Sequence, residues 1–311
     1  MVRLSARSTA PLRHDAPTGA TCAPLAAHVE VNGICLPYVE QGSGQPVVFV
    51  HGAISDLCVW EPVRVEFATR DGIATTYRFV AYTQRYFGTH PWPDDGRQFS
   101  AATHADDLAK FIAASDAGPV HLVGTSYGGL VAALAAVRNP ALVRSLVLYE
   151  PALVCVLPED TEDGKAARQD RAEFIGAVIS ALRAGDAIGA ARLMHEAVNQ
   201  LPPGGFDREP QAIQARVLDN ARTLPLLFAT LSSPHISCTA LKGFDRPTLV
   251  MRGEKTQAYY VLINQAISRY FPAAQQVVLK NANHGGPRRD PAAFTGAVFE
   301  FLSKRDRDDP V

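Results

Sequence analysis

The chain has 311 residues, of which 47% are hydrophobic and 20% are charged, and its formal net charge is -1. This length and composition are typical of a globular protein and exclude wholesale disorder. A nearly neutral chain gives no reason to expect nucleic acid or an anionic membrane as a partner.

The cysteines and the apolar runs bear on the compartment. Five scattered cysteines without Cys-x-x-Cys spacing indicate neither a disulfide framework nor a zinc site, and they fit a reducing compartment. No apolar run approaches the roughly 20 residues that span a bilayer. Residues 1–26 are rich in Ala, Pro, Thr, Ser and Arg and lack the apolar block of a signal peptide, which leaves a flexible tail or a transit-like leader open. We favour the tail and expect a soluble, cytoplasmic protein.

Strands and helices alternate over the first half of the chain. Residues 28–42 alternate in polarity around Asn32-Gly33, which predicts a hairpin because both residues tolerate positive φ. The elements expected next are a strand over 46–52, a helix over 60–72, a strand over 77–85, a helix over 100–115 capped by Ser100 or Thr103, a strand over 119–126, a helix over 128–140 and a strand over 143–150.

The alternation stops at residue 150. Residues 151–242 contain helical stretches at 172–185, 187–200 and 211–224 and no convincing strand. Alternation then resumes with a strand over 247–253, a helix over 258–270, a strand over 275–281 and a closing helix over 291–302.

This order predicts an α/β fold: a mostly parallel, doubly wound sheet of about eight strands with a helical lid inserted over one end. The expected division is a tail over 1–26, a core over 27–150 and 243–304, a helical lid over 151–242 and a C-terminal tail over 305–311.

The segment "VHLVGTSYGGLVAALAA" carries the clearest chemical signal. Gly124-Thr125-Ser126-Tyr127-Gly128 matches G-x-S-x-G between a predicted strand and a predicted helix, as a nucleophile elbow requires. The strained turn raises the serine oxygen at the helix N-terminus, and the glycines let neighbouring backbone come close. We therefore expect Ser126 to be the nucleophile.

A serine hydroxyl needs a base, because it is a weak nucleophile at neutral pH. Three histidines follow Ser126 in the chain: His195 and His235 in the predicted lid, and His284. His284 lies between the last strand and the last helix, which is the place of the base in the chain order Ser, acid, His. We expect His284 to be that base.

The oxyanion donors are expected in two loops. "VVFVHGAISD" is a strand that ends in His51-Gly52, and its loop directs a backbone N–H toward the developing oxyanion. The N–H groups of Ala53 and of Tyr127, the residue after the nucleophile, form the expected pair.

With these segments in view, residues 28–303 resemble the α/β-hydrolase family with a helical lid. The resemblance rests on "VVFVHG", "AYTQRYFGTHPWPDDG", "VHLVGTSYGGLVA", "RPTLVMRGE" and "NANHGG…DPAAFTGAVFEFL". Many members carry Arg-Gly-His-Gly, a small residue and Ser after the fourth strand, where this chain has "RYFGTH" over 85–90. This departure predicts a change in the pocket floor.

The resemblance also implies an Asp two residues after the Gly-Glu that ends the seventh strand, but Thr256 stands there. Two carboxylates can replace it: Glu150 at the tip of the sixth strand and Glu254 at the tip of the seventh. Some family members, including lactonases of macrocyclic lactones, place the acid after the sixth strand, at about the separation of 24 residues between Ser126 and Glu150. We favour Glu150 and keep Glu254 as the alternative; a Ser–His dyad or a distant acid also remains open.

The expected function is hydrolysis of a small carboxylic ester or lactone through an acyl-enzyme, without a metal or cofactor. Trp60, Tyr86 and Phe228 are candidates for lining the acyl pocket, or else they are core residues. C–C bond hydrolysis, cofactor-free perhydrolysis, hydroxynitrile cleavage and a non-catalytic small-molecule binding protein of the same fold are the alternatives. The sequence does not indicate the oligomeric state.

Overall fold

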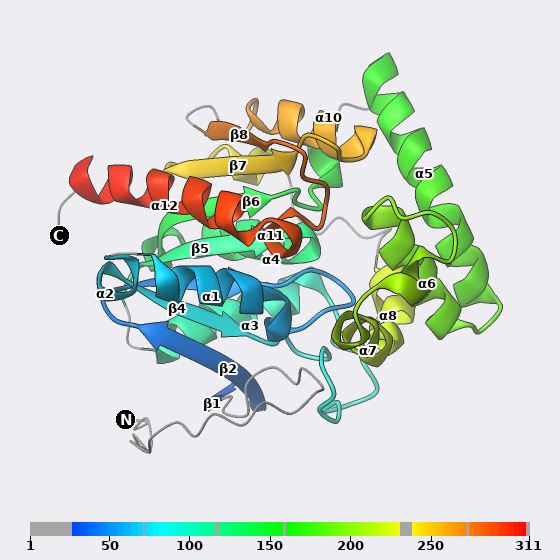
Figure 1. Ribbon diagram of the computed structural model, residues 1–311, viewed down its shortest axis with the longest axis horizontal. Helices are drawn as coiled ribbons and strands as arrows, with labels where there is room; N and C mark the ends of the chain where they lie inside the picture. Colours follow the sequence, from blue (N-terminus) through cyan, green and yellow to red (C-terminus); the bar gives the residue numbers. More distant parts are fainter. Residues whose placement is uncertain are drawn as a thin grey trace.

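The computed structural model describes residues 27–70, 72–115, 118–157, 160–230, 238–271 and 274–308. The N-terminal tail expected over 1–26 lies outside them. The described residues form a sheet of eight strands in the order β1-β2-β4-β3-β5-β6-β7-β8, with helices on both faces (Figure 1). The predicted α/β fold class is confirmed.

The sheet is antiparallel at one edge and parallel elsewhere. β1 and β2 form the hairpin predicted at Asn32-Gly33, and β2 also runs antiparallel to β4; the other neighbours are parallel. The strands are β1 (Ala27–Val31), β2 (Ile34–Gly42), β3 (Gln45–Val50), β4 (Tyr77–Tyr82), β5 (Val120–Thr125), β6 (Val143–Tyr149), β7 (Thr248–Gly253) and β8 (Gln275–Leu279).

Two apolar cores cover the two faces of the sheet. Successive side chains of a strand point to opposite faces, so the β-branched run of β3 contributes Val48 and Val50 to one core and Val47 and Phe49 to the other. Strands buried on both faces read as continuous apolar runs, which explains why the central strands were predictable.

The helices of the core lie in two layers. α3 (Ala101–Ala114), α4 (Ser126–Arg138) and α10 (Ala258–Ile267) pack on one face, and α1 (Glu61–Thr69) and α12 (Pro291–Asp308) pack on the other, as Figure 1 shows. Short helices α2 (Ile73–Thr76) and α11 (Gly286–Arg289) precede β4 and α12. The Ser100 hydroxyl accepts a hydrogen bond from the Thr103 N–H at 3.0 Å, so Ser100 is the N-cap of α3.

The segment between β6 and β7, here called the helical insert (residues 151–242), contains helices and no strand in its described part. They are α5 (Glu162–Arg183), α6 (Ala187–Val198), α7 (Gln211–Asp219), α8 (Leu224–Ala229) and α9 (Cys238–Leu241). At the right of Figure 1 four of these helices, those labelled α5 to α8, lie beside one end of the sheet.

The unusual loop over 85–90 is tied to the helical insert. Asn220 accepts a hydrogen bond from the Gly88 N–H at 2.7 Å, and Arg222 donates to the carbonyls of Gly88 and His90 at 2.9 and 2.6 Å. The loop that departs from the family pattern therefore holds the insert in place.

Two expectations from the sequence are corrected. α12 continues to Asp308, past the expected end at 302 and through the start of the expected C-terminal tail, because Asp306 accepts hydrogen bonds from Tyr77 and Arg144 at 2.6 and 3.0 Å. Cys58 is disulfide-bonded, although the cysteine spacing indicated no disulfide. Spacing along the chain says little about cysteines that the fold brings together.

No helix in the described parts of the chain combines the length and the apolar character that a membrane crossing requires.

Candidate active site

Ser126 lies in a strained turn between β5 and α4. Its φ is 53°, in the left-handed region that residues with a side chain rarely adopt. The adjacent glycines are required by space: a Cβ on Gly124 would lie 2.5 Å from the carbonyl oxygen of Gly128, and a Cβ on Gly128 would lie 2.3 Å from that of His51. Because α4 packs directly against the backbone of β3 and β5, there is no room for a side chain at positions 124 and 128.

Glu150 occupies the equivalent place at the end of β6, also with positive φ, of 42°. Its side chain is buried, and its carboxylate accepts hydrogen bonds from the Gly253 N–H at 2.8 Å (Oε1) and from the Thr256 hydroxyl at 2.9 Å (Oε2). The same Oε2 lies 2.7 Å from Nδ1 of His284. A buried carboxylate with these donors is held in one orientation.

His284 is fixed from three directions. Glu150 contacts its Nδ1, and the ring of Tyr260 stacks on the imidazole with 4.6 Å between centroids and 16° between planes. The preceding residue, Asn283, accepts a hydrogen bond from the Tyr149 hydroxyl at 2.5 Å and donates to the Asn199 carbonyl at 2.7 Å. Nε2 of His284 lies 3.4 Å from the Tyr260 hydroxyl.

Glu254 is directed elsewhere. It is exposed, and its carboxylate accepts the Asn281 N–H at 2.9 Å. That bond closes the turn after β8, where Asn281 has a φ of 59°. Of the two carboxylates that the sequence offered, the structure brings Glu150 to His284.

The two expected oxyanion donors, Ala53 and Tyr127, belong to the loop after β3 and to the first turn of α4. Ala53 follows β3 and lines the cavity described below. Tyr127 is the second residue of α4, where backbone N–H groups have no acceptor within the helix. Its phenol is committed to Nδ1 of the buried His104 at 2.7 Å, so only its backbone is available for a ligand.

His51 supports the loop that carries Ala53. The ring contacts the Gly52 carbonyl at 2.8 Å through Nδ1 and accepts the Gln84 N–H at 3.0 Å through Nε2. Burial lowers the pKa of His51 to about 4, so the ring is neutral at neutral pH. This histidine joins the ends of β3 and β4 and does not serve as a base.

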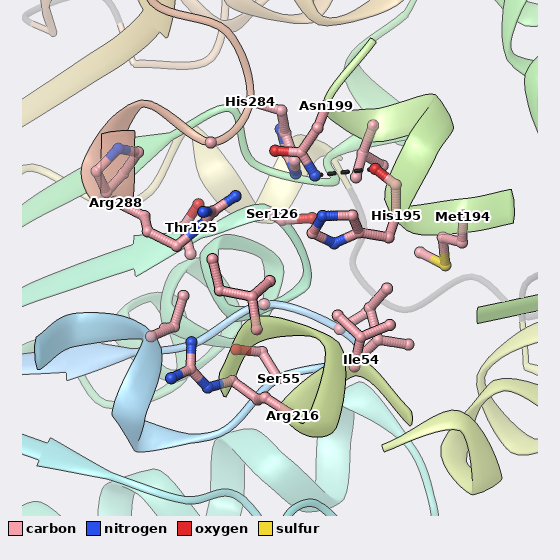
Figure 2. A pocket seen from close by; sticks show the side chains of 18 of the residues that line it. Ile54, Ser55, Thr125, Ser126, Met194, His195, Asn199, Arg216, His284 and Arg288 are labelled. Atoms are coloured by element: carbon pink, nitrogen blue, oxygen red, sulfur yellow. Dashed lines mark hydrogen bonds between the residues drawn. The ribbon is translucent and has the colours of Figure 1, made fainter. Parts of the chain in front are cut away.

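A cavity of about 110 Å³ opens beside Ser126 (Figure 2). The core and the helical insert both contribute to its wall. It is lined by Gly52, Ala53, Ile54, Ser55, Val59, Trp60, Thr125, Ser126, Met194, His195, Val198, Asn199, Ile213, Arg216, Val217, His284, Gly285, Pro287 and Arg288.

The three expected pocket aromatics have different locations. Trp60 lines the cavity but is almost fully buried between Phe49 and Phe294. Tyr86 and Phe228 are not among the lining residues: the Tyr86 hydroxyl donates to Asp94, and Phe228 packs against the core. No role in the pocket is proposed for Tyr86 or Phe228.

Three titratable side chains that the sequence analysis did not place at the site line the cavity. They are His195 of α6, Arg216 of α7 and Arg288 of α11. Burial lowers the pKa of His195 to about 4. Only Arg288 carried a usable signal, because it follows His284 by four residues in the chain.

The comparison with known proteins decides the family. A model described as "Alpha/beta hydrolase family" matches residues 47–297. The chain belongs to the alpha/beta hydrolase family. The chain is also similar to a Mesorhizobium japonicum protein named 2-(acetamidomethylene)succinate hydrolase, which is 27% identical over 285 residues, covering 89% of this chain and 95% of the relative.

Solved alpha/beta hydrolases share the fold. The esterase RhEst1 from Rhodococcus sp. ECU1013 is 26% identical, with a TM-score of 0.69 over 89% of this chain and 97% of that one. Est816, described as an N-acyl homoserine lactone degrading enzyme, is 23% identical, with a TM-score of 0.65 over 88% of this chain and 100% of that one. At this identity the likeness to Est816 shows the fold alone.

Proposed function

We propose that the protein is a serine hydrolase that cleaves a small carboxylic ester or lactone through an acyl-enzyme. The observation that carries the proposal is the 2.7 Å contact between Nδ1 of His284 and the buried carboxylate of Glu150. With Nδ1 bound to the carboxylate, Nε2 is the ring nitrogen that accepts a proton from Ser126.

In the proposed reaction, Ser126 Oγ attacks the carbonyl carbon of the substrate while His284 takes the hydroxyl proton. Glu150 stabilises the resulting imidazolium, and the N–H groups of Ala53 and Tyr127 bind the oxyanion. Collapse of the intermediate expels the alcohol, which takes the proton from His284. Water then attacks the acyl-enzyme with the same base, and the acid product leaves with Ser126 regenerated.

The relatives support hydrolysis but differ in the compound they are named for. RhEst1 is named an esterase, Est816 is named for a lactone, and the Mesorhizobium relative is named for a substituted succinate. We place the proposal at an acyl group carried on oxygen, the class that the names of RhEst1 and Est816 share.

The test is turnover of p-nitrophenyl acetate and of a panel of short-chain lactones by the wild type and by Ser126→Ala. We expect Ser126→Ala to lose at least about 10³-fold in kcat. Ser180→Ala, at an exposed serine of α5, is the matched control and is expected to behave as wild type. Absence of Ser126-dependent turnover for every ester and lactone would leave a non-catalytic binding protein as the better account.

A further inference from the structure

Two arginines from different parts of the chain line the cavity beside Ser126. Arg216 belongs to α7 of the helical insert, and Arg288 belongs to α11, shortly after His284. In Figure 2 both lie on the left of the view, while Met194 lies on the right. The two cations therefore lie on one side of a small cavity, while Met194 and the polar residues His195 and Asn199 lie farther to the right.

The acids that pair with these arginines do not line the cavity. Arg216 Nε lies 3.2 Å from Asp56, and Arg288 Nη1 donates to Glu209 at 3.3 Å; neither acid is among the lining residues. Glu209 is shared, because Arg289 also donates to it. In these direct ion pairs three guanidiniums face two carboxylates; the third guanidinium, that of Arg289, does not line the cavity, so the wall holds the two cations Arg216 and Arg288 and neither of their acids.

Another acid near Arg216 does not remove this excess. Glu61 acts on Arg216 only at long range, and its two carboxylate oxygens accept hydrogen bonds from Arg64 at 2.6 and 2.8 Å. A bidentate pair of this kind commits the carboxylate to one partner.

Several donors around the cavity lack an acceptor. Among the described residues, Nη2 of Arg288, Nε of Arg216 and Nε1 of Trp60 are buried without a hydrogen-bond partner. The contact between Arg216 Nε and Asp56 is close, but it does not have the direction of a hydrogen bond. Buried polar atoms without a partner also occur elsewhere in the described residues, but here the unpartnered nitrogens of Arg216 and Arg288 belong to two cations that line one cavity, where the oxygens of a ligand would satisfy them.

The electrostatics agree with this view. Burial lowers the pKa of both guanidiniums, and the charge of Arg216 lowers the pKa of Arg288 further. Two like charges held close in a poorly solvated site destabilise each other, and a bound anion relieves both.

We propose that Arg216 and Arg288 bind a carboxylate of the substrate, so that the ester or lactone cleaved at Ser126 carries a second, ionised acid group. The proposal rests on the proposed hydrolysis at the same site. A planar guanidinium fork matches a carboxylate better than it matches an uncharged acyl chain. The cavity of about 110 Å³ is smaller than an engineered cavity that binds benzene, about 150 Å³. The part of the substrate that lies in the cavity is accordingly short.

The first test needs no variant. It compares kcat/KM for two isosteric pairs: monoethyl succinate against ethyl succinamate, with the charge on the acyl side, and acetylglycolate against acetylglycolamide, with the charge on the alcohol side. We expect the carboxylate to be preferred by roughly 10- to 100-fold in at least one pair. Ser126-dependent turnover with no preference for the carboxylate in either pair would overturn the proposal.

Variants then assign the preference to the arginines. Arg216→Gln and Arg288→Gln are expected to reduce the ratio of charged to neutral turnover toward one, and Arg288→Lys to keep part of it, because lysine keeps the charge but loses the fork. Arg192→Gln is the matched control, since Arg192 is exposed and pairs with Asp207 outside the cavity. If Arg216→Gln does not fold, the two Arg288 variants alone test whether the arginines cause the preference for the carboxylate. An unchanged ratio in folded Arg288→Gln would contradict the assignment.

A binding experiment separates this proposal from the proposed hydrolysis. Calorimetry measures the binding of succinate and of neutral succinamide to Ser126→Ala. Binding of succinate alone, lost in Ser126→Ala/Arg288→Gln, supports the carboxylate site even if no ester is turned over. Turnover of neutral esters by the wild type without succinate binding leaves the hydrolysis standing and overturns the carboxylate site.

Discussion

The hydroxyl of Thr256 donates a hydrogen bond to Oε2 of Glu150 at 2.9 Å, the same oxygen that contacts His284. Thr256, three residues past the end of β7, stands where the family resemblance implied an Asp. Residue 256 therefore does not supply the carboxylate. Its hydroxyl instead donates a hydrogen bond to the carboxylate of Glu150, which follows β6.

Thr256→Val removes this donor with little change in shape. A hydrogen bond to a charged group contributes about 1.5–3 kcal/mol, and part of the loss is recovered by the Gly253 N–H and by His284, so we expect kcat to fall roughly 10-fold with KM nearly unchanged. Thr256→Ser keeps the hydroxyl and is the matched control. Steady-state kinetics of both variants with one ester checks this, and a loss confined to KM would count against a role through Glu150.

The two candidate acids are distinguished by removing one negative charge at a time. Glu150→Gln keeps the size of the side chain but leaves the imidazolium without its counter-charge, and we expect kcat to fall roughly 10³- to 10⁴-fold. Glu254→Gln is expected to stay within about threefold of wild type, because its carboxylate binds an exposed backbone N–H. The measurement is kcat for both variants, with circular dichroism to confirm folding; the reverse pattern would transfer the role to Glu254.

Gly128→Ala tests the close approach of α4 to β3. The added methyl would lie 2.3 Å and 2.4 Å from the carbonyl oxygens of His51 and Val50, so the helix must move, and we expect a loss of about 3 kcal/mol or more in the free energy of unfolding. Gly176→Ala is the control, because no atom lies within 4 Å of a Cβ at this interior position of α5. It is expected to stabilise by about 0.5–1 kcal/mol. Urea denaturation of both variants gives the comparison.

The fold is expected to lose stability in mildly acidic solution. Burial lowers the pKa of His51 to about 4 and that of His104 to about 3, whereas an unfolded histidine titrates near its ordinary value of 6.5. The unfolded chain therefore takes up protons first: stability is fully present above pH 6.5 and declines as the pH falls toward the two lowered values. Each histidine contributes a slope of up to about 1.4 kcal/mol per pH unit.

His104→Gln isolates one of these contributions. The free energy of unfolding, measured by denaturant at pH 7, 6 and 5, is expected to decline less steeply than in the wild type. The same substitution at exposed His90 is the control. An equally steep decline in His104→Gln would show that His104 does not remain neutral in the folded protein.

The features predictable from the sequence are those that a local pattern determines. Asn32-Gly33 fixes a turn, apolar runs fix the buried strands, and the glycines around Ser126 fix the turn that carries it. Chain order was sufficient to point to His284. The choice between Glu150 and Glu254 stayed open, because both end a strand and only the folded backbone determines where each side chain points.

The rest of the cavity could not be read from the sequence, for a physical reason. Arg216 belongs to a helix whose periodicity shows which of its faces is apolar but not which part of the core that face meets. Large aromatic residues were therefore candidates by size alone, whereas Tyr86 and Phe228 are used elsewhere. The disulfide of Cys58 could not be predicted either, because it depends on which cysteines the fold brings close together.

Ser126 and Glu150 both have left-handed backbone conformations, at the ends of adjacent strands. Conformations of this kind cost about 1–3 kcal/mol each in a residue with a side chain, and the surrounding sheet has to supply that energy. Glycine at either position would relax the backbone and remove the chemistry in one step. Selection of this protein for thermal resistance alone is therefore expected to enrich inactive variants at these two positions, so a thermostability screen needs an activity readout alongside it.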